Sequence, residues 1–181
     1  NRIYSNLLEA VLRLAFFVFY IWVISFSKDV KRVYEYHGAE HKSIYAYENK
    51  MELTPENAKG FTTLHPRCGT SFLLIVMLIS IIVFSCMDFI LPVPANGIER
   101  IIIKVVLRVI LMPLIAGISY EIQRYSSNHL DKIWVRALAF PGLSLQRITT
   151  KEPDLSQLEV AIVAIKAALG EEVENATEVE G

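Results

Sequence analysis

Two histidines four positions apart mark the segment Tyr36-His37-Gly38-Ala39-Glu40-His41-Lys42. On an α-helix the side chains of His37 and His41 lie one turn apart on the same face, so both imidazoles can approach one metal ion. The spacing resembles the H-x-x-E-H motif of inverted zinc peptidases, in which the glutamate is the general base; here that residue is Glu40. So short a match is weak evidence. The alternative is that both histidines bond lipid headgroups or loop carbonyls.

Further metal-ligand types occur in the same part of the chain. The sequence has four histidines, and His65 joins the first two in one polar segment that also holds Cys68. Three imidazoles and a thiolate are a plausible tetrahedral zinc set, and a helix beginning at Cys68 would favour its thiolate. The alternatives are that His65 only caps a helix before Pro66, and that Cys68 is inert or is a reactive thiol beside Arg67.

A carboxylate and a buried cation complete the candidate residues. Glu121 follows the third apolar stretch, and as a third ligand it would make an open, catalytic His, His, Glu site. Its alternative role is an interface anchor or a partner of Arg124. Arg108 lies deep in the same stretch, where a cation pairs with a group such as Asp88 or binds a lipid phosphate.

The composition is too apolar for an ordinary soluble fold. Hydrophobic residues make up 53% of the 181 residues, and the mean hydropathy is +0.39. A net charge of -1 and the lack of a basic tract argue against a nucleic-acid partner. Two cysteines are too few for a disulfide framework, which fits a reducing compartment. We expect the lipid bilayer, and other membrane proteins, as partners.

Three apolar stretches are long enough to cross a bilayer, which takes about 20 helical residues. They cover residues 7–26, 72–91 and 101–120. The loop 28–71 carries seven Lys or Arg, whereas the link between the second and third stretches has only Arg100. The positive-inside rule therefore places the loop and the C-terminus in the cytoplasm, as in a multi-pass protein of the bacterial inner membrane.

The remaining segments predict further helices and an all-α fold. Lys28–Asn49 continues from the first span, and Thr54-Pro55 starts a short helix. An interfacial helix begins near residue 130 and ends at Pro141-Gly142, and Asp154 caps a helix Leu155–Leu169 with Gln157 in the capping-box position. We expect one membrane-embedded domain over residues 1–170 and a disordered acidic tail over 171–181. The first residue is Asn rather than Met, so we expect upstream sequence.

The ordered series of motifs resembles the bacterial YqhQ family of uncharacterised membrane proteins over nearly the whole chain, from about Asn6 to Leu169. The resemblance implies a metal-dependent enzyme and a further N-terminal segment, and it fixes neither reaction nor substrate. The motifs are Tyr36-His37-Gly38-Ala39-Glu40-His41-Lys42, Leu64-His65-Pro66-Arg67-Cys68-Gly69-Thr70-Ser71-Phe72, Ala116-Gly117-Ile118-Ser119-Tyr120-Glu121, Pro141-Gly142-Leu143 with Gln146-Arg147, and Glu152-Pro153 with Gln157-Leu158-Glu159-Val160-Ala161.

Three functions fit these residues. The first is a metal-dependent hydrolase for a peptide or ester, with zinc on His37, His41 and either Glu121 or His65, and Glu40 as base. The second is a non-catalytic assembly or translocation partner whose His/Cys cluster is structural. The third, ranked last, is thiol chemistry at Cys68 with a histidine as base.

Overall fold

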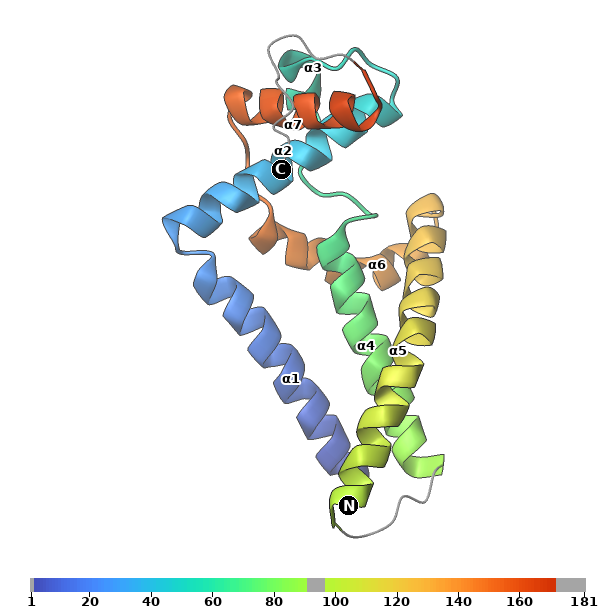
Figure 1. Cartoon of the computed structure of the whole chain (residues 1–181). Helices are drawn as coiled ribbons and strands as arrows, with labels where there is room; N and C mark the ends of the chain where they lie inside the picture. The colour runs from blue at the N-terminus through green and yellow to red at the C-terminus, as the bar shows by residue number, and fades with distance from the viewer. Residues whose placement is uncertain (1, 91–96, 172–181) are drawn as a thin grey trace. The chain divides into compact units, whose positions relative to one another are not determined.

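The computed structural model describes residues 2–90 and 97–171 (Figure 1). All secondary structure in these ranges is helical, which confirms the all-α prediction. The predicted acidic tail lies outside the described residues, apart from Glu171. The helices are α1 (Arg2–Ile24), α2 (Lys28–Glu48), α3 (Pro55–Lys59), α4 (Gly69–Ile90), α5 (Gly97–Asn128), α6 (Ile133–Thr149) and α7 (Leu155–Ala168).

Two of these helices, α4 and α5, are long and apolar enough to cross a membrane. A third span is added if the bent pair Leu8–Ile24 and Lys28–Glu48 counts as one broken span. The sequence predicts about three spans, and the third of these depends on counting the bent pair as one span. Helix α5 extends beyond the predicted range 101–120 at both ends. At its C-terminal end, polar residues such as Gln123 and Ser126 continue the helix after the apolar run stops.

The contacts between residues divide the chain into two compact units. Unit 1 consists of Asn1–Tyr20 and Pro66–Leu145, and unit 2 of Ile21–His65 and Gln146–Gly181. Each unit is therefore built from two separated stretches of sequence. The organisation as one domain over residues 1–170 stays a prediction.

Unit 2 is assembled around α2, with α3 and α7 packed on it (Figure 1). Its core contains small residues on α2, Ala39 and Ala46, which are fully buried against Leu158 and Ile162 of α7. Alanine at these positions lets the two helices approach closely, and the aliphatic side chains of α7 supply the apolar area that stabilises the contact.

Side chains that cap the helices explain where α3 and α7 begin. The hydroxyl of Thr54 accepts a hydrogen bond from the Asn57 N–H, and Pro55 occupies the first turn of α3. The carboxylate of Asp154 accepts from the Gln157 N–H at 2.9 Å, and the Gln157 side chain accepts from the Asp154 N–H, also at 2.9 Å. Both predicted caps are thus confirmed, including the capping box.

In unit 1, α4 packs along α5, and α6 crosses close to the first turn of α4. A Cβ on Gly142 would come within 2.9 Å of the Ser71 side chain, so only glycine permits this approach. The predicted end of the helix at Pro141-Gly142 is wrong, since α6 continues through both residues to Thr149. Tight packing at Gly142 outweighs the penalty of an internal proline.

Candidate metal site

Helix α2 carries the two histidines of the first motif on one face. His37 is half-buried and His41 is buried, and their ring centroids lie 4.4 Å apart. Glu40, which lies between the two histidines in the sequence, is exposed. The helical spacing therefore brings the two imidazoles together as the sequence predicts.

Both rings are oriented by backbone carbonyls of other segments of unit 2. His37 Nδ1 donates to the carbonyl oxygen of Thr149 at 2.8 Å, and His41 Nδ1 donates to that of Thr63 at 2.5 Å. A carbonyl oxygen only accepts, so each Nδ1 must carry the proton. In the neutral tautomer the lone pair is then on Nε2, which is how proteins orient a histidine that binds a metal. The sequence analysis offered hydrogen bonds to carbonyls as an alternative to metal binding by the two histidines. The two roles are compatible, because each uses a different nitrogen of the ring.

The segment that supplies the Thr149 carbonyl is fixed along α2 by further contacts. The Lys151 N–H donates to the Tyr34 carbonyl at 2.9 Å. A Cβ on Gly38 would lie 2.0 Å from the Lys151 carbonyl oxygen, so this approach requires glycine. The buried ammonium of Lys42 donates to Glu152 at 2.5 Å and to the Lys59 carbonyl at 2.9 Å. Gly38 and Lys42 thus help to position the segments whose carbonyls accept hydrogen bonds from the two histidines.

His65 lies beside the histidine pair in unit 2. Its ring centroid is 5.6 Å from that of His41 and 4.8 Å from that of Tyr45. The side chain of Gln146, which is fully buried, accepts from the His65 N–H at 2.7 Å and donates to its carbonyl at 2.8 Å. His65 Nε2 is 3.5 Å from a carboxylate oxygen of Glu48. This ring nitrogen therefore faces a carboxylate.

Cys68 is buried and directly precedes α4. Its carbonyl accepts from the Phe72 N–H at 3.1 Å, as expected for the residue before a first helical turn, and from Gln123 Nε2 at 2.8 Å. Its sulfur lies 2.9 Å from the Thr70 hydroxyl. The helix that begins here gives the thiolate form a favourable electrostatic environment.

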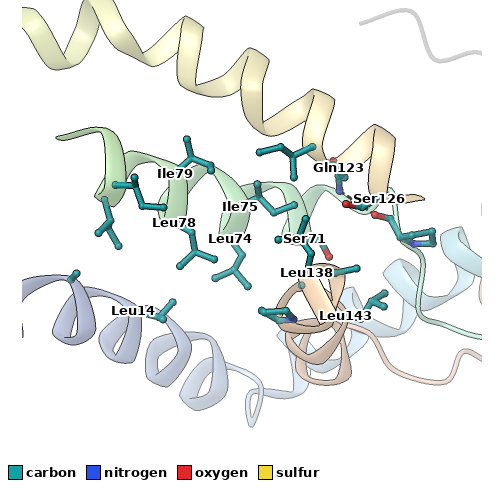
Figure 2. A pocket seen from close by; sticks show the side chains of 18 of the residues that line it. Leu14, Ser71, Leu74, Ile75, Leu78, Ile79, Gln123, Ser126, Leu138 and Leu143 are labelled. Carbon is teal, nitrogen blue, oxygen red and sulfur yellow. Dashed lines mark hydrogen bonds between the residues drawn. The ribbon is translucent and has the colours of Figure 1, made fainter. Parts of the chain in front are cut away.

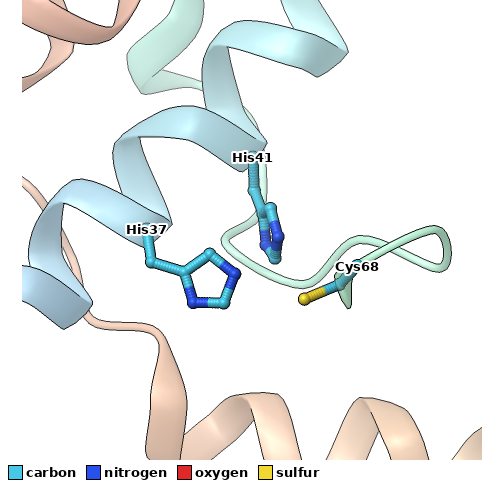
Figure 3. A group of neighbouring side chains, drawn as sticks. All are labelled: His37, His41 and Cys68. Atoms are coloured by element: carbon cyan, nitrogen blue, oxygen red, sulfur yellow. The ribbon is translucent and has the colours of Figure 1, made fainter. Parts of the chain in front are cut away.

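His37, His41 and Cys68 form a group that could hold a metal ion (Figure 3). One ligand atom from each residue lies within 4.8 Å of the other two. Two imidazole nitrogens and a sulfur are donors that suit zinc among the divalent ions, so the residues present fit the implied metal. The identity of the metal stays a prediction.

The other predicted site residues have less specific surroundings. The side chain of Glu121 is 66% exposed, and its carboxylate lies 3.7 Å from Arg124, as in its alternative role. Arg67 is exposed. The guanidinium of Arg108 stacks over the Phe84 ring, 5.2 Å from the centroid. The structure describes the backbone but not the side chain of Asp88, one of the two partners expected for Arg108. The roles of Glu40, Glu121, Arg67 and Arg108 at a site stay predictions.

Several residues that shape the site were missed by the sequence analysis. Gly38, Lys42 and Gln146 act through contacts with segments about 80 to 110 residues away, which spacing alone does not show. The signal that could have found them was membership of the motif series: Gly38 and Lys42 share a motif with His37 and His41, and Gln146 belongs to a separate motif.

These features define a helical protein with two or three helices suited to spanning a membrane and a group of His, His and Cys side chains. The chain belongs to the family described as protein of unknown function (DUF1385), whose model matches residues 1–171. It is 37% identical over 162 residues to the uncharacterised protein YqhQ of Bacillus subtilis (strain 168), covering 90% of this chain. It spans about half, 48%, of that curated relative. No solved structure matches the chain significantly.

Proposed function

We propose that this chain is a membrane-embedded, metal-dependent hydrolase that binds a divalent ion, zinc above others, through His37, His41 and Cys68. The observation that carries the proposal is the grouping of three ligand atoms within 4.8 Å. The carbonyl bonds to both Nδ1 atoms support it, because they direct the Nε2 lone pairs to a ligand role. Three protein ligands leave a fourth position for a substrate or water, as in catalytic rather than structural zinc sites.

Bound zinc would supply Lewis-acid chemistry, which polarises a carbonyl and makes water more acidic. The base in this proposal is Glu40, an exposed carboxylate in the same motif as the two histidines, which would accept a proton from water. The water hydroxyl adds to the acyl carbon of a peptide or ester, and the bond to the leaving amine or alcohol breaks. The proton held by Glu40 then passes to that leaving group.

Metal analysis tests the ligand set with variants that keep the fold. In His37→Asn and His41→Asn the side-chain amide can still donate to the Thr149 or Thr63 carbonyl, but it lacks the Nε2 ligand. We expect stoichiometric zinc in the wild type purified without chelator, and loss of zinc in both variants and in Cys68→Ser. The matched control is His129→Asn, since His129 lies outside the proposed ligand set and its Nδ1 donates to the Tyr125 carbonyl in the same way. A metal-free wild type, or zinc retained in all three variants, would contradict the proposal.

A structural role is the second candidate, and the place of His65 favours it. Its ring is 5.6 Å from that of His41, so a rotation could bring a fourth ligand and close the site. The Co²⁺-loaded protein distinguishes the two functions. Under the structural role, His65→Ala changes the ligand-field spectrum of Co²⁺ and Glu40→Gln leaves every property unchanged. Under the hydrolase, Glu40→Gln abolishes turnover with metal content retained, and His65→Ala leaves the spectrum as it was.

A further inference from the structure

Unit 1 contains a partly open apolar cavity between its helices (Figure 2). Its volume is about 440 Å³, within the roughly 300–1,000 Å³ of cavities that hold a small organic ligand. The wall comes from α1, α4, α5 and α6, and most of it is aliphatic. Residues that represent each helix are Leu14, Leu74, Leu78, Ile122 and Leu138.

The polar groups of this cavity are gathered at one end. In Figure 2, Ser71, Gln123 and Ser126 lie toward one side, and Leu14, Leu78 and Ile79 toward the other. Ser71 is in the first turn of α4, and Gln123 and Ser126 are near the end of α5. The polar end is thus level with the ends of the two spanning helices, and the apolar end lies deeper along them.

A buried hydroxyl at the polar end is available to a ligand that carries an oxygen. Ser126 is 6% exposed, and its Oγ has no hydrogen-bond partner among the described residues. Leaving a buried hydroxyl without a partner costs about 1–3 kcal/mol, so such groups usually meet a ligand or water. Ser126 lines the cavity, where an ester or headgroup oxygen would accept a hydrogen bond from its hydroxyl.

We propose that this cavity holds one acyl chain of a membrane phospholipid, with its ester end at Ser126. The chain lies along the aliphatic wall at the depth of the lipid tails, and the ester reaches the level where α4 begins. Pro66 lines the polar end, and Gln123 donates from one amide nitrogen to the carbonyls of both Pro66 and Cys68, at 3.3 and 2.8 Å. A ligand that contacts Gln123 therefore lies against the turn that carries a proposed metal ligand.

This occupant narrows the substrate of the proposed hydrolase from a peptide or ester to an acyl ester, an extension that rests on the proposed function. Binding of the acyl chain itself does not depend on metal.

Photocrosslinking tests the occupant in the whole chain. The protein is placed in nanodiscs of phosphatidylethanolamine and phosphatidylglycerol that carry a diazirine in one acyl chain, and the crosslinked residues are mapped by mass spectrometry. We expect crosslinks at Leu74, Leu78 and Leu143. Leu74→Trp fills the cavity and should abolish the crosslinks at the other two positions. The neighbouring Leu73→Trp is the control, because Leu73 is 57% exposed and does not line the cavity.

Ser126→Ala provides a second, milder variant that keeps the volume of the cavity nearly unchanged. We expect it to move the crosslinks along the wall, since the ester is no longer fixed at one end. Crosslinks confined to the exposed faces of α4 and α5 would overturn the proposal, and so would unchanged crosslinks in Leu74→Trp. Co-purification of a lipid that has no acyl chain in this cavity would also overturn it. Zinc content is measured on the same samples: a metal-free protein that crosslinks refutes only the hydrolase, and a zinc-bound protein without crosslinks refutes only the lipid site.

Discussion

Gly38 is the residue at which one methyl group should have the largest effect on unit 2. Alanine usually stabilises a helix interior relative to glycine by about 1 kcal/mol. Here the added Cβ would lie 2.0 Å from the Lys151 carbonyl oxygen, and backbone cannot yield as a flexible side chain does. We therefore expect Gly38→Ala to lower the free energy of unfolding by about 1–3 kcal/mol, measured by thermal unfolding in detergent.

Gly117→Ala is the matched control for this change. Gly117 is also inside a helix, α5, and a Cβ there would meet nothing within 4 Å. It should leave the melting temperature unchanged or raise it. A Gly38→Ala protein as stable as the control would show that the Lys151 segment does not approach α2 as described.

At this scale the sequence predicts which residues gather but not how they are oriented. The helical spacing of His37 and His41 follows from local geometry. The hydrogen bond from His37 to Thr149 joins residues 112 apart in sequence, and Gln146 bonds a peptide 81 residues away. Such contacts depend on the tertiary fold, so no local pattern could have indicated that the Nδ1 atoms bond carbonyls.

Helix ends are predicted well where a side chain makes the cap and poorly where packing decides. Thr54 and Asp154 bond the backbone within three residues, so both starts could be read from sequence. The end of α6 could not, because the proline signal at Pro141 competes with a contact between Gly142 and Ser71, which are distant in sequence.

The Asp154 cap of α7 makes part of the stability of unit 2 dependent on pH. Hydrogen bonds from the Ser156 hydroxyl and the Gln157 N–H lower the pKa of Asp154 below its ordinary value of 3.8. A carboxyl whose pKa is depressed in the folded state contributes stability above its unfolded pKa and loses it as the pH falls through the folded pKa. The wild type should therefore lose melting temperature relative to Asp154→Asn as the pH is lowered below 3.8.

Asparagine caps a helix without titrating, so the difference between these two proteins isolates the carboxylate. Glu159→Gln removes another exposed carboxylate of α7 and should keep the wild-type profile. Parallel melting curves for wild type and Asp154→Asn across this pH range would argue against the cap.

For the whole molecule, the charge distribution predicts the side of the membrane on which the site lies. The lysine- and arginine-rich loop 28–71 is expected in the cytoplasm, and the start of α5 on the opposite side. Single cysteines are introduced at two exposed positions, Glu52 and Glu99, and treated with a membrane-impermeant maleimide. Glu99→Cys should react in intact cells, and Glu52→Cys only after permeabilisation.

Reaction above the background of the native Cys68 and Cys86 is the quantity compared. The reverse pattern would place the metal-ligand group outside the cell and remove the reason to expect a reduced thiol at Cys68.

The interleaving of the two units has a consequence for how the protein is made. Gln157 donates to Glu35 across 122 residues, and the carbonyl that orients His37 follows α5 in the chain. A ribosome therefore finishes α4 and α5 before it adds the residues that complete unit 2. Until then the face of α2 that will contact α7 stays open, and His37 lacks its acceptor. Under the proposed function, an ion that reached the nascent chain early would meet imidazoles not yet aligned, so the metal would be loaded only after unit 2 is complete.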